Sequence, residues 1–243
     1  DQMISDGNPP FCLGWGSDDA TGWPATDWLE DWVLRMNGPD VYDEWWQHEI
    51  PFNDDQIVET AESLHDLWAQ DDFVFGGLSQ AASADFRSAG TSILDGDCMM
   101  YRMSNFYGAL LQEEGAELGD DADASAFYLP GSEEDPNITL TAGMYAVAFS
   151  DSPATQAFME YLAGTEYADS RAANEIGGFL SPNANVDTSL YTTELDQQFG
   201  EIMAEAVYEV PDPIPAEDPP TISNVEWGVD RINAPDVCDT FDA

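Results

Sequence analysis

An extreme excess of acidic residues is the feature that most limits how this chain can fold. It has 49 Asp and Glu residues against five Arg and no Lys, a formal net charge of −44. Charges of one sign weaken a compact state, but salt screens them, with a Debye length of about 8 Å at physiological ionic strength and about 3 Å in molar salt. The composition therefore predicts adaptation to molar salt, with adaptation to low pH as the alternative, because solubility alone needs far less charge.

The same charge restricts the partners of the protein. Phosphate backbones and anionic membrane surfaces repel it, so the sequence argues against nucleic-acid binding. With 43% hydrophobic residues among 243, the chain can form a globular fold with a real core. It contains no apolar run that could span a bilayer, and it starts at Asp1 without a signal peptide, which predicts an internal or processed start.

Strands and helices alternate in the coarse sequence pattern, which favours an α/β fold. We expect strand and loop over 1–24, a short strand within 92–103, a buried strand over 139–149 and a proline-rich linker over 211–220. We expect a helix from N-cap Asp27 to a stop at Gly38-Pro39, and a second after an Asn53/Gln56 capping box, with the apolar stripe Ile57, Ala61, Leu64 and Trp68. A third helix should open at Ser152-Pro153, with Phe158, Tyr161 and Leu162 facing inward. Two more helices are expected over 165–175 and 194–207.

No catalytic or metal-binding motif stands out in the chain. His48 and His65 match no metal-ligand spacing, and the GxSxG elbow and the Gly-rich nucleotide loops are missing. Asp120, Asp121 and Asp123 lack the Gly and the distal Glu of a calcium loop, so we interpret them as a solvated acidic run. Carboxylates are so abundant that no pair of them indicates glycoside hydrolysis. The sequence therefore predicts no enzyme, no metal and no cofactor.

The tryptophans and cysteines leave alternatives open. Trp32 and Trp68 lie on apolar helical stripes and are expected in the core. Trp23, in a Gly-Trp-Pro loop, and Trp227, after the proline linker, either stack on the apolar face of a sugar or cover a core edge. The three cysteines lack CxxC spacing, so either two of them form a disulfide outside the cell or all three are buried thiols.

An ordered series of short motifs resembles the solute-binding proteins of ABC sugar importers, particularly the α-glucoside-binding branch. Each motif is weak alone, but their succession covers nearly the whole chain. The motifs are Pro10-Phe11-Cys12, Thr21-Gly22-Trp23-Pro24, Thr26-Asp27-Trp28, Gly38-Pro39-Asp40-Val41-Tyr42, His48-Glu49-Ile50-Pro51-Phe52-Asn53-Asp54, Gly96-Asp97-Cys98-Met99-Met100 with Arg102, Ala157-Phe158-Met159-Glu160-Tyr161-Leu162-Ala163, and Gly177-Gly178-Phe179-Leu180-Ser181-Pro182-Asn183.

This resemblance implies a periplasmic-binding-protein-like (type II) fold of two α/β lobes joined by hinge strands, present here only as its carboxy-terminal portion. It places 1–140 in the second lobe, 141–190 as a hinge strand and helices of the first lobe, and 191–243 as closing helices of the second lobe. The amino-terminal part of the family has no counterpart in this sequence. The 141–190 segment should therefore lack sheet partners within the chain.

The resemblance also implies a ligand site and a disulfide. The implied ligand-binding residues, around a cleft between the lobes, are Trp23, Asp27, Trp28, Arg102, Phe106, Tyr145 and Trp227. The chain departs from its relatives at Thr141-Ala142-Gly143-Met144, where they carry a glycine cluster with an acid. Relatives have cysteines at the positions of Cys12 and Cys98, which implies a disulfide that contributes about 4 kcal/mol and leaves Cys238 free.

In function, the resemblance implies the carbohydrate-binding component of an ABC importer, extracellular or periplasmic and lipid-anchored in its full-length form. We expect a monomer that binds a neutral mono- or oligosaccharide without chemistry and then docks on a membrane permease. The scarcity of cations also fits an uncharged ligand. The alternatives are a secreted glycoside hydrolase, and an acidic surface-layer or structural module whose carboxylates bind cations.

Overall fold

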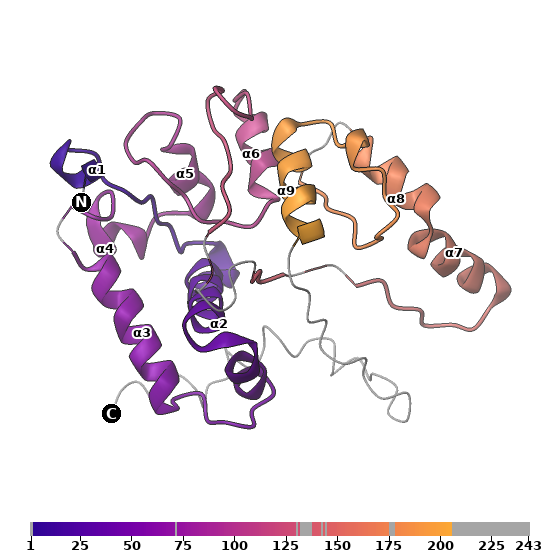
Figure 1. Ribbon diagram of the computed structural model, residues 1–243, viewed down its shortest axis with the longest axis horizontal. Coiled ribbons are helices and arrows are strands. Elements are labelled where there is room, and N and C mark those ends of the chain that lie inside the picture. Colours follow the sequence, from indigo (N-terminus) through magenta and orange to yellow (C-terminus); the bar gives the residue numbers. More distant parts are fainter. Residues whose placement is uncertain are drawn as a thin grey trace.

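The computed structural model describes residues 2–70, 72–129, 131, 138–141, 143, 145–174 and 178–205, and helices dominate this part of the chain (Figure 1). In chain order the elements are α1 (Gln2–Ser5), the 3₁₀ turn η1 (Asp18–Ala20), α2 (Trp23–Trp46), α3 (Asp55–Trp68), α4 (Gly77–Ala81), α5 (Phe86–Thr91), α6 (Tyr107–Glu113), α7 (Pro153–Ala163), α8 (Thr165–Ala172), the 3₁₀ turn η2 (Thr188–Leu190) and α9 (Glu194–Glu205).

Helix α2 carries Trp23, Asp27 and Trp28 of the predicted ligand site. It begins about one turn before its predicted start, so Asp27 is not the N-cap. Gly22 leads into it with a left-handed backbone (φ 109°), and Pro24 fits the first turn because no amide donor is needed there. Gly38 is non-helical at φ 84° and ψ 173°, and helical residues resume after it. The predicted stop at Gly38-Pro39 is therefore a kink within one long element.

Helix α3 packs against α2 through the predicted apolar stripe. Its cap is Asp54 rather than Asn53, since the Asp54 carboxylate accepts a hydrogen bond from the Gln56 amide at 3.1 Å. Ile57 and Leu64 are buried against α2. The Asn37 side chain on α2 also donates to the Thr60 hydroxyl at 2.7 Å, so apolar and polar contacts both hold the two helices together.

Short parallel pairings replace the strands expected near the amino terminus. Phe11 forms isolated parallel bridges with Val74 on one side and Met100 on the other. Next to these bridges, Cys12 is joined to Cys98 by a disulfide with a Cα–Cα distance of 5.5 Å. In the described residues the expected strands within 1–24 and 92–103 are thus reduced to single bridges, because only a few backbone groups of each segment find a partner.

Aromatic rings fill the core between these bridges and helices α2 and α3. Trp28 is 3% exposed and lies with its ring centroid 5.5 Å from that of Phe11 and 5.7 Å from that of Trp68. Trp32 packs against the same cluster and donates its indole N–H to Ser63 at 2.9 Å. The prediction that Trp32 and Trp68 belong to the core is confirmed.

The described residues of the segment 139–149 do not form the predicted buried strand. Tyr145 is 81% exposed, Val147 and Phe149 are exposed as well, and no β-pairing is present along the described part of this segment. A strand needs neighbouring backbone to accept its hydrogen bonds and apolar cover for its side chains. No described segment of the chain provides either one here.

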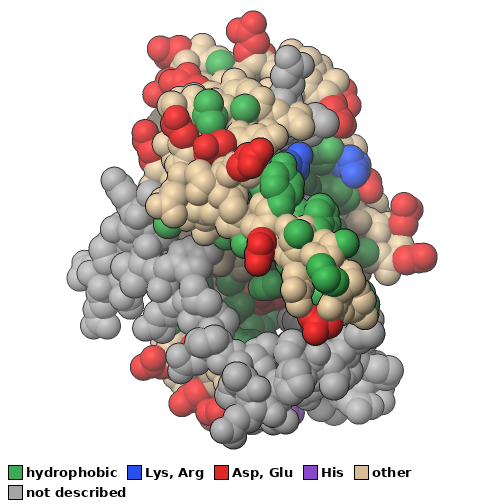
Figure 2. Space-filling view, turned by 90° about the vertical axis from the view of Figure 1, so that its right-hand side faces the viewer, with side chains coloured by type: hydrophobic (Ala, Val, Ile, Leu, Met, Phe, Trp, Pro, Cys, Tyr) green, Lys and Arg blue, Asp and Glu red, His purple; other side chains and the backbone are tan. Residues whose placement is uncertain are grey.

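Helix α7 begins and ends as predicted but is not packed as predicted. The Ser152 hydroxyl accepts a hydrogen bond from the Thr155 amide at 3.1 Å, Pro153 opens the helix and Gly164 ends it. None of its residues is buried, and Phe158 and Tyr161 are exposed, so their expected inward orientation is wrong. Figure 2 shows hydrophobic side chains gathered on this side of the molecule, with acidic side chains mostly around them.

The last helices return the chain to the body of the molecule. Helix α9 lies beside α6 (Figure 1), and Leu195 is buried where it meets Gly108. The predicted helices over 165–175 and 194–207 are confirmed as α8 and α9. Within the described residues, none of the helices combines the length and the apolar character that crossing a bilayer requires.

Candidate ligand-binding site

Five of the predicted ligand residues come together around the first turns of α2. Trp23 and Asp27 are one turn apart and share a face of the helix. The loop before α6 brings Arg102 and Phe106 to this face. The Trp23 ring centroid lies 6.1 Å from that of Phe106 and 5.1 Å from that of Phe86. We call the surface formed by Trp23, Asp27, Arg102 and Phe106 the α2 face.

The carboxylate of Asp27 is the polar group of the α2 face that is most open to a ligand. Its side chain is 32% exposed, and Arg102 Nη1 lies 3.9 Å from its Oδ2. Burial raises the pKa of the Asp27 carboxyl, and the nearby Arg102 charge opposes this rise. Among the described residues no hydrogen bond to this carboxylate is present, so its oxygens are available to accept one from a ligand.

Trp28 supports the site from below instead of lining it. The Arg102 guanidinium carbon lies 5.6 Å from the centre of the Trp28 ring. The Trp28 side chain is only 3% exposed, so other protein groups cover the rest of the indole. A ring this deeply buried has no free face for a sugar. In this structure Trp28 is thus not open to a ligand, and its described polar neighbour is the Arg102 guanidinium that lies over its ring.

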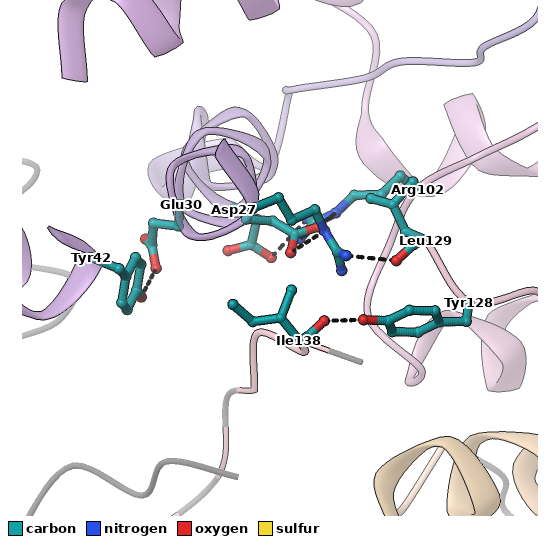
Figure 3. Close-up of polar contacts among 9 residues, drawn as sticks. Asp27, Glu30, Tyr42, Arg102, Tyr128, Leu129 and Ile138 are labelled. Atoms are coloured by element: carbon teal, nitrogen blue, oxygen red, sulfur yellow. Dashed lines mark hydrogen bonds and ion pairs between the residues drawn. The ribbon is translucent and has the colours of Figure 1, made fainter. Parts of the chain in front are cut away.

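Two residues that the sequence did not single out, Asp31 and Arg35, complete a buried ionic network. Asp31 Oδ1 accepts from Arg35 Nε at 3.0 Å, while its Oδ2 accepts from Arg102 Nε at 3.3 Å and lies 3.2 Å from Arg102 Nη2. Arg35 Nη1 also donates to the Leu129 carbonyl at 2.6 Å. Figure 3 shows how α2, Arg102 and the Tyr128–Leu129 segment converge at this network.

The Tyr128–Leu129 segment is held at the network by two further contacts. The guanidinium carbon of Arg35 lies 5.4 Å from the centre of the Tyr128 ring. The Tyr128 hydroxyl donates to the carbonyl of Ile138, which is itself buried (Figure 3). The network therefore connects the α2 face to the chain that leads toward residue 138.

A third carboxylate, Glu30, also projects from the first turns of α2 and reaches toward Tyr42 (Figure 3). The Tyr42 hydroxyl donates to Glu30 Oε2 at 3.1 Å. Burial raises the pKa of Glu30 to about 7, because little water solvates its charge, while the Tyr42 hydrogen bond opposes the rise. Burial also raises the pKa of Tyr42, so its hydroxyl stays protonated as the donor of this bond.

The remaining predicted site residues are not part of the α2 face as described. Tyr145 is exposed, and no ring contact joins it to the other described aromatics. Trp227, Met144 and Cys238, as well as the linker 211–220, lie outside the described residues.

One cavity of the described chain lies apart from the α2 face. A cavity of about 160 Å³ lies next to the disulfide, lined by Cys12, Leu13, Phe75, Gln80, Ala84, Ser88, Ala89 and Ser92, and none of the predicted ligand residues borders it. In the described part of the chain, no group of His, Cys, Asp or Glu side chains could hold a metal ion. The α2 face itself offers the Asp27 carboxylate as an acceptor, the Arg102 guanidinium as a donor, and the partly exposed rings of Trp23 and Phe106.

The sequence does contain a signal for Asp31 and Arg35, the two network residues that the motifs did not indicate. Asp27, Asp31 and Arg35 recur at intervals of four residues, so they lie along one face of a helix. With only five arginines in the chain, an arginine on the same helical face as two acids is informative.

Comparison with known proteins finds similarity to named binding proteins. The chain is 34% identical over 211 residues to the osmoprotective compounds-binding protein GgtB of Synechocystis, which is 84% of this chain and 48% of that protein. It is 35% identical over 215 residues to the alpha-glucosides-binding periplasmic protein AglE of Rhizobium meliloti, which is 85% of this chain and 45% of that protein. The chain therefore spans about half the length of the curated relatives it matches.

No protein-family model matches the chain, and no solved structure matches it. Both relatives are named as binding proteins and neither as an enzyme. The similarity extends over most of the chain, which agrees with the ordered succession of motifs seen in the sequence. The chain is accordingly a homologue of the solute-binding proteins that its motifs resemble.

Proposed function

We propose that the protein is the solute-binding component of an ABC importer and that it binds an uncharged sugar or glucoside on the α2 face. The observation that carries this proposal is the Asp27 carboxylate, which is partly exposed and lies beside an oriented guanidinium. A carboxylate accepts hydrogen bonds from hydroxyl groups and a guanidinium donates to them. Trp23 and Phe106 beside them offer apolar ring surface for the C–H face of a sugar.

The charge balance of the site supports a neutral ligand. Two guanidinium groups, Arg35 and Arg102, face two carboxylates, Asp27 and Asp31, so the network is close to neutral before a ligand arrives. The rest of the chain carries a large negative charge. A phosphate or carboxylate ligand would meet no unmatched cation at the α2 face and would be repelled by the surroundings.

The relatives narrow the choice of ligands to test. One is named for α-glucosides and the other for osmoprotective compounds. We propose an uncharged ligand from this range, bound reversibly and without chemistry by a monomer outside the cytoplasm and then delivered to a membrane permease. Lipid anchoring and ligand stacking by Trp227 and Tyr145 belong to the same proposal.

The direct test is a thermal-shift and calorimetric screen of the complete gene product in molar KCl. Methyl α-glucoside, sucrose and trehalose represent neutral α-glucosides, and glucose 6-phosphate and glucuronate represent anionic analogues. We expect at least one neutral sugar to raise the melting temperature and both anions to leave it unchanged. A chromogenic α-glucoside should release no nitrophenol, since turnover would indicate a glycosidase.

Matched variants locate the site. Asp27→Asn and Trp23→Ala should abolish the thermal shift. Asp43→Asn and Trp46→Ala are the controls, because Trp46 is an exposed tryptophan on the same helix, hydrogen-bonded to Asp43 at 2.8 Å, away from the α2 face. Retained sugar binding in both Asp27→Asn and Trp23→Ala would rule out this surface, and a screen without any positive sugar would rule out the ligand class.

We also propose the two-lobe arrangement, with 1–140 and 191–243 in one lobe and 141–190 in the other. It is supported by the exposed apolar residues Tyr145, Val147, Phe149 and Phe158, which have no cover within the described chain. If a second lobe covers them in the complete gene product, Phe149→Asp should lower its melting temperature by several degrees. The same substitution in the 243-residue chain alone should have little effect. Equal, small effects in both would contradict the assignment.

A further inference from the structure

We propose that Asp31 and Arg35 are positioning residues for the ligand site: they fix the orientation of the Arg102 guanidinium and tie it to the Tyr128–Leu129 segment. This inference rests on the proposed function of the α2 face. Neither residue reaches the surface where a ligand binds, since the side chains of Asp31 and Arg35 are 5% and 9% exposed. They therefore act through Arg102.

The first step of the argument is the geometry around Asp31. Each of its two carboxylate oxygens serves a different arginine: Oδ1 accepts from Arg35 Nε and Oδ2 from Arg102 Nε. The Arg102 guanidinium also lies over the Trp28 ring. Because one face of the guanidinium is stacked and one edge is bonded to Asp31, the edge carrying Nη1 is the one directed toward Asp27.

The second step is what keeps Asp31 itself in place. A buried carboxylate between two arginines needs both of them, because removal of one partner leaves a buried charge poorly compensated. Arg35 is held at its other end by the Leu129 carbonyl, at 2.6 Å, and by the Tyr128 ring. Arg35 thus uses the fork of its guanidinium to bind two acceptors from distant parts of the chain.

The third step is the consequence for the ligand. The donor that a ligand meets at Arg102 keeps its direction only while Asp31 holds it, and Asp31 keeps its place only while Arg35 does. A lysine at position 35 would supply the charge but not the two-pronged geometry. The chain Arg35–Asp31–Arg102–Asp27 therefore sets the direction of the polar contact to the ligand, although only its last two members are accessible.

The experiment measures affinity for the best neutral sugar of the screen in wild type, Arg35→Gln, Arg35→Lys, Asp31→Asn and Arg102→Gln. We expect Arg35→Gln and Asp31→Asn to weaken binding by about tenfold or more while the variants remain folded. Arg35→Lys should restore little of the loss. In the Arg102→Gln background, Arg35→Gln should cause no further loss, because its effect passes through Arg102.

Thr60→Val is the matched control, since Thr60 is a polar α3 residue 4% exposed, like Asp31, and hydrogen-bonds only within α2 and α3. It should lower the melting temperature without changing the affinity. Full affinity in Arg35→Gln, full rescue by Arg35→Lys, or losses that add in the double variant would each overturn the inference.

A second readout needs no ligand, so that failure of the proposed function remains distinguishable. The chain has only five arginines, so the NMR spectrum of the arginine Nε–Hε groups is simple enough to assign with single variants. The Arg102 Hε should exchange slowly with water in wild type and in Thr60→Val, and much faster in Arg35→Gln and Asp31→Asn. Unchanged exchange in both variants would show that the network does not hold Arg102, whatever the protein binds.

Discussion

The disulfide between Cys12 and Cys98 is the covalent link on which the position of Arg102 depends. Both cysteines are 1% exposed, and the Cys12 amide donates to the Met100 carbonyl at 2.9 Å. The link therefore fixes residues 98–102 against the first segment of the chain. Its replacement in a Cys12→Ala/Cys98→Ala variant should lower both the stability of the fold and the affinity of the site.

The size of the stability loss follows from the length of the closed loop. The two cysteines are 86 residues apart in sequence, and the chain-entropy relation then gives an unfolded-state entropy difference equivalent to about 4.6 kcal/mol at room temperature. Removing two buried sulfur atoms adds a small packing loss, about 1 kcal/mol or less. The expected total, about 5 kcal/mol, is a large fraction of the stability of a typical domain.

Urea unfolding in molar KCl measures this loss. The disulfide-bonded protein and the Cys12→Ala/Cys98→Ala variant both carry Cys238→Ser, so that no third thiol can exchange with the disulfide. With a urea slope of about 2.5 kcal/mol per molar, the midpoint of the variant should fall by about 2 M. A fall of less than about 0.5 M would refute the reasoning, because it would mean that the closed loop is not free in the unfolded state or that the disulfide strains the fold.

Three further predictions follow from particular residues. Folding raises the pKa of Glu30 from 4.5 to about 7, so between these pH values the folded state holds a proton that the unfolded state releases. The free energy of unfolding is therefore highest below the unfolded pKa of Glu30. It declines as the pH rises to about 7, by on the order of 3 kcal/mol. Glu30→Gln stays neutral, so its advantage in melting temperature over wild type should grow between about pH 5 and about pH 8; an advantage independent of pH would contradict this cause. The melting temperature should rise steeply from dilute buffer to molar salt, similarly for KCl and NaCl, because screening of a net charge of −44 is responsible, and a flat response would remove the case for salt adaptation. Gly38→Ala should cost about 1–3 kcal/mol in urea unfolding, since φ 84° and ψ 173° suit only glycine, and an unchanged midpoint would show that the kink is not required.

Local signals predicted the helices well. Ser152 and Pro153 open α7 because a hydroxyl cap and a proline at the first position satisfy the helix start without any tertiary partner. The stripe of Ile57 and Leu64 faces α2 because helical periodicity alone determines which side of α3 is apolar. The cap itself was misplaced by one residue, since Asn53 and Asp54 both offer a side-chain acceptor.

Strands and burial were predicted less well, because they depend on distant parts of the chain. The apolar run at 139–149 reads as a buried strand, yet burial needs a neighbouring sheet that no described segment supplies. For the site, the motifs placed Trp23, Asp27, Arg102 and Phe106 on one surface. They could not show that Trp28 points into the core or that Asp31 bridges two arginines, because both facts arise from the packing of α2 against residues near position 100.

The arginines suggest one cause for the composition and for the proposed ligand class. Each of the four described arginines has its guanidinium carbon near an aromatic ring centre, at 5.4 Å for Arg35 and Tyr128, 5.2 Å for Arg87 and Phe86, 5.6 Å for Arg102 and Trp28, and 4.7 Å for Arg171 and Phe179. A planar, weakly hydrated guanidinium can stack in this way, whereas an ammonium group prefers water. Dissolved cations can neutralise exposed carboxylates, but they cannot stack on a ring and bond a carboxylate in a fixed direction. Positive side chains therefore persist where such directed contacts are needed. At the α2 face the charge of Arg102 is already matched by Asp31 and Asp27. Arg102 can therefore offer a ligand a directed hydrogen bond but no unmatched charge.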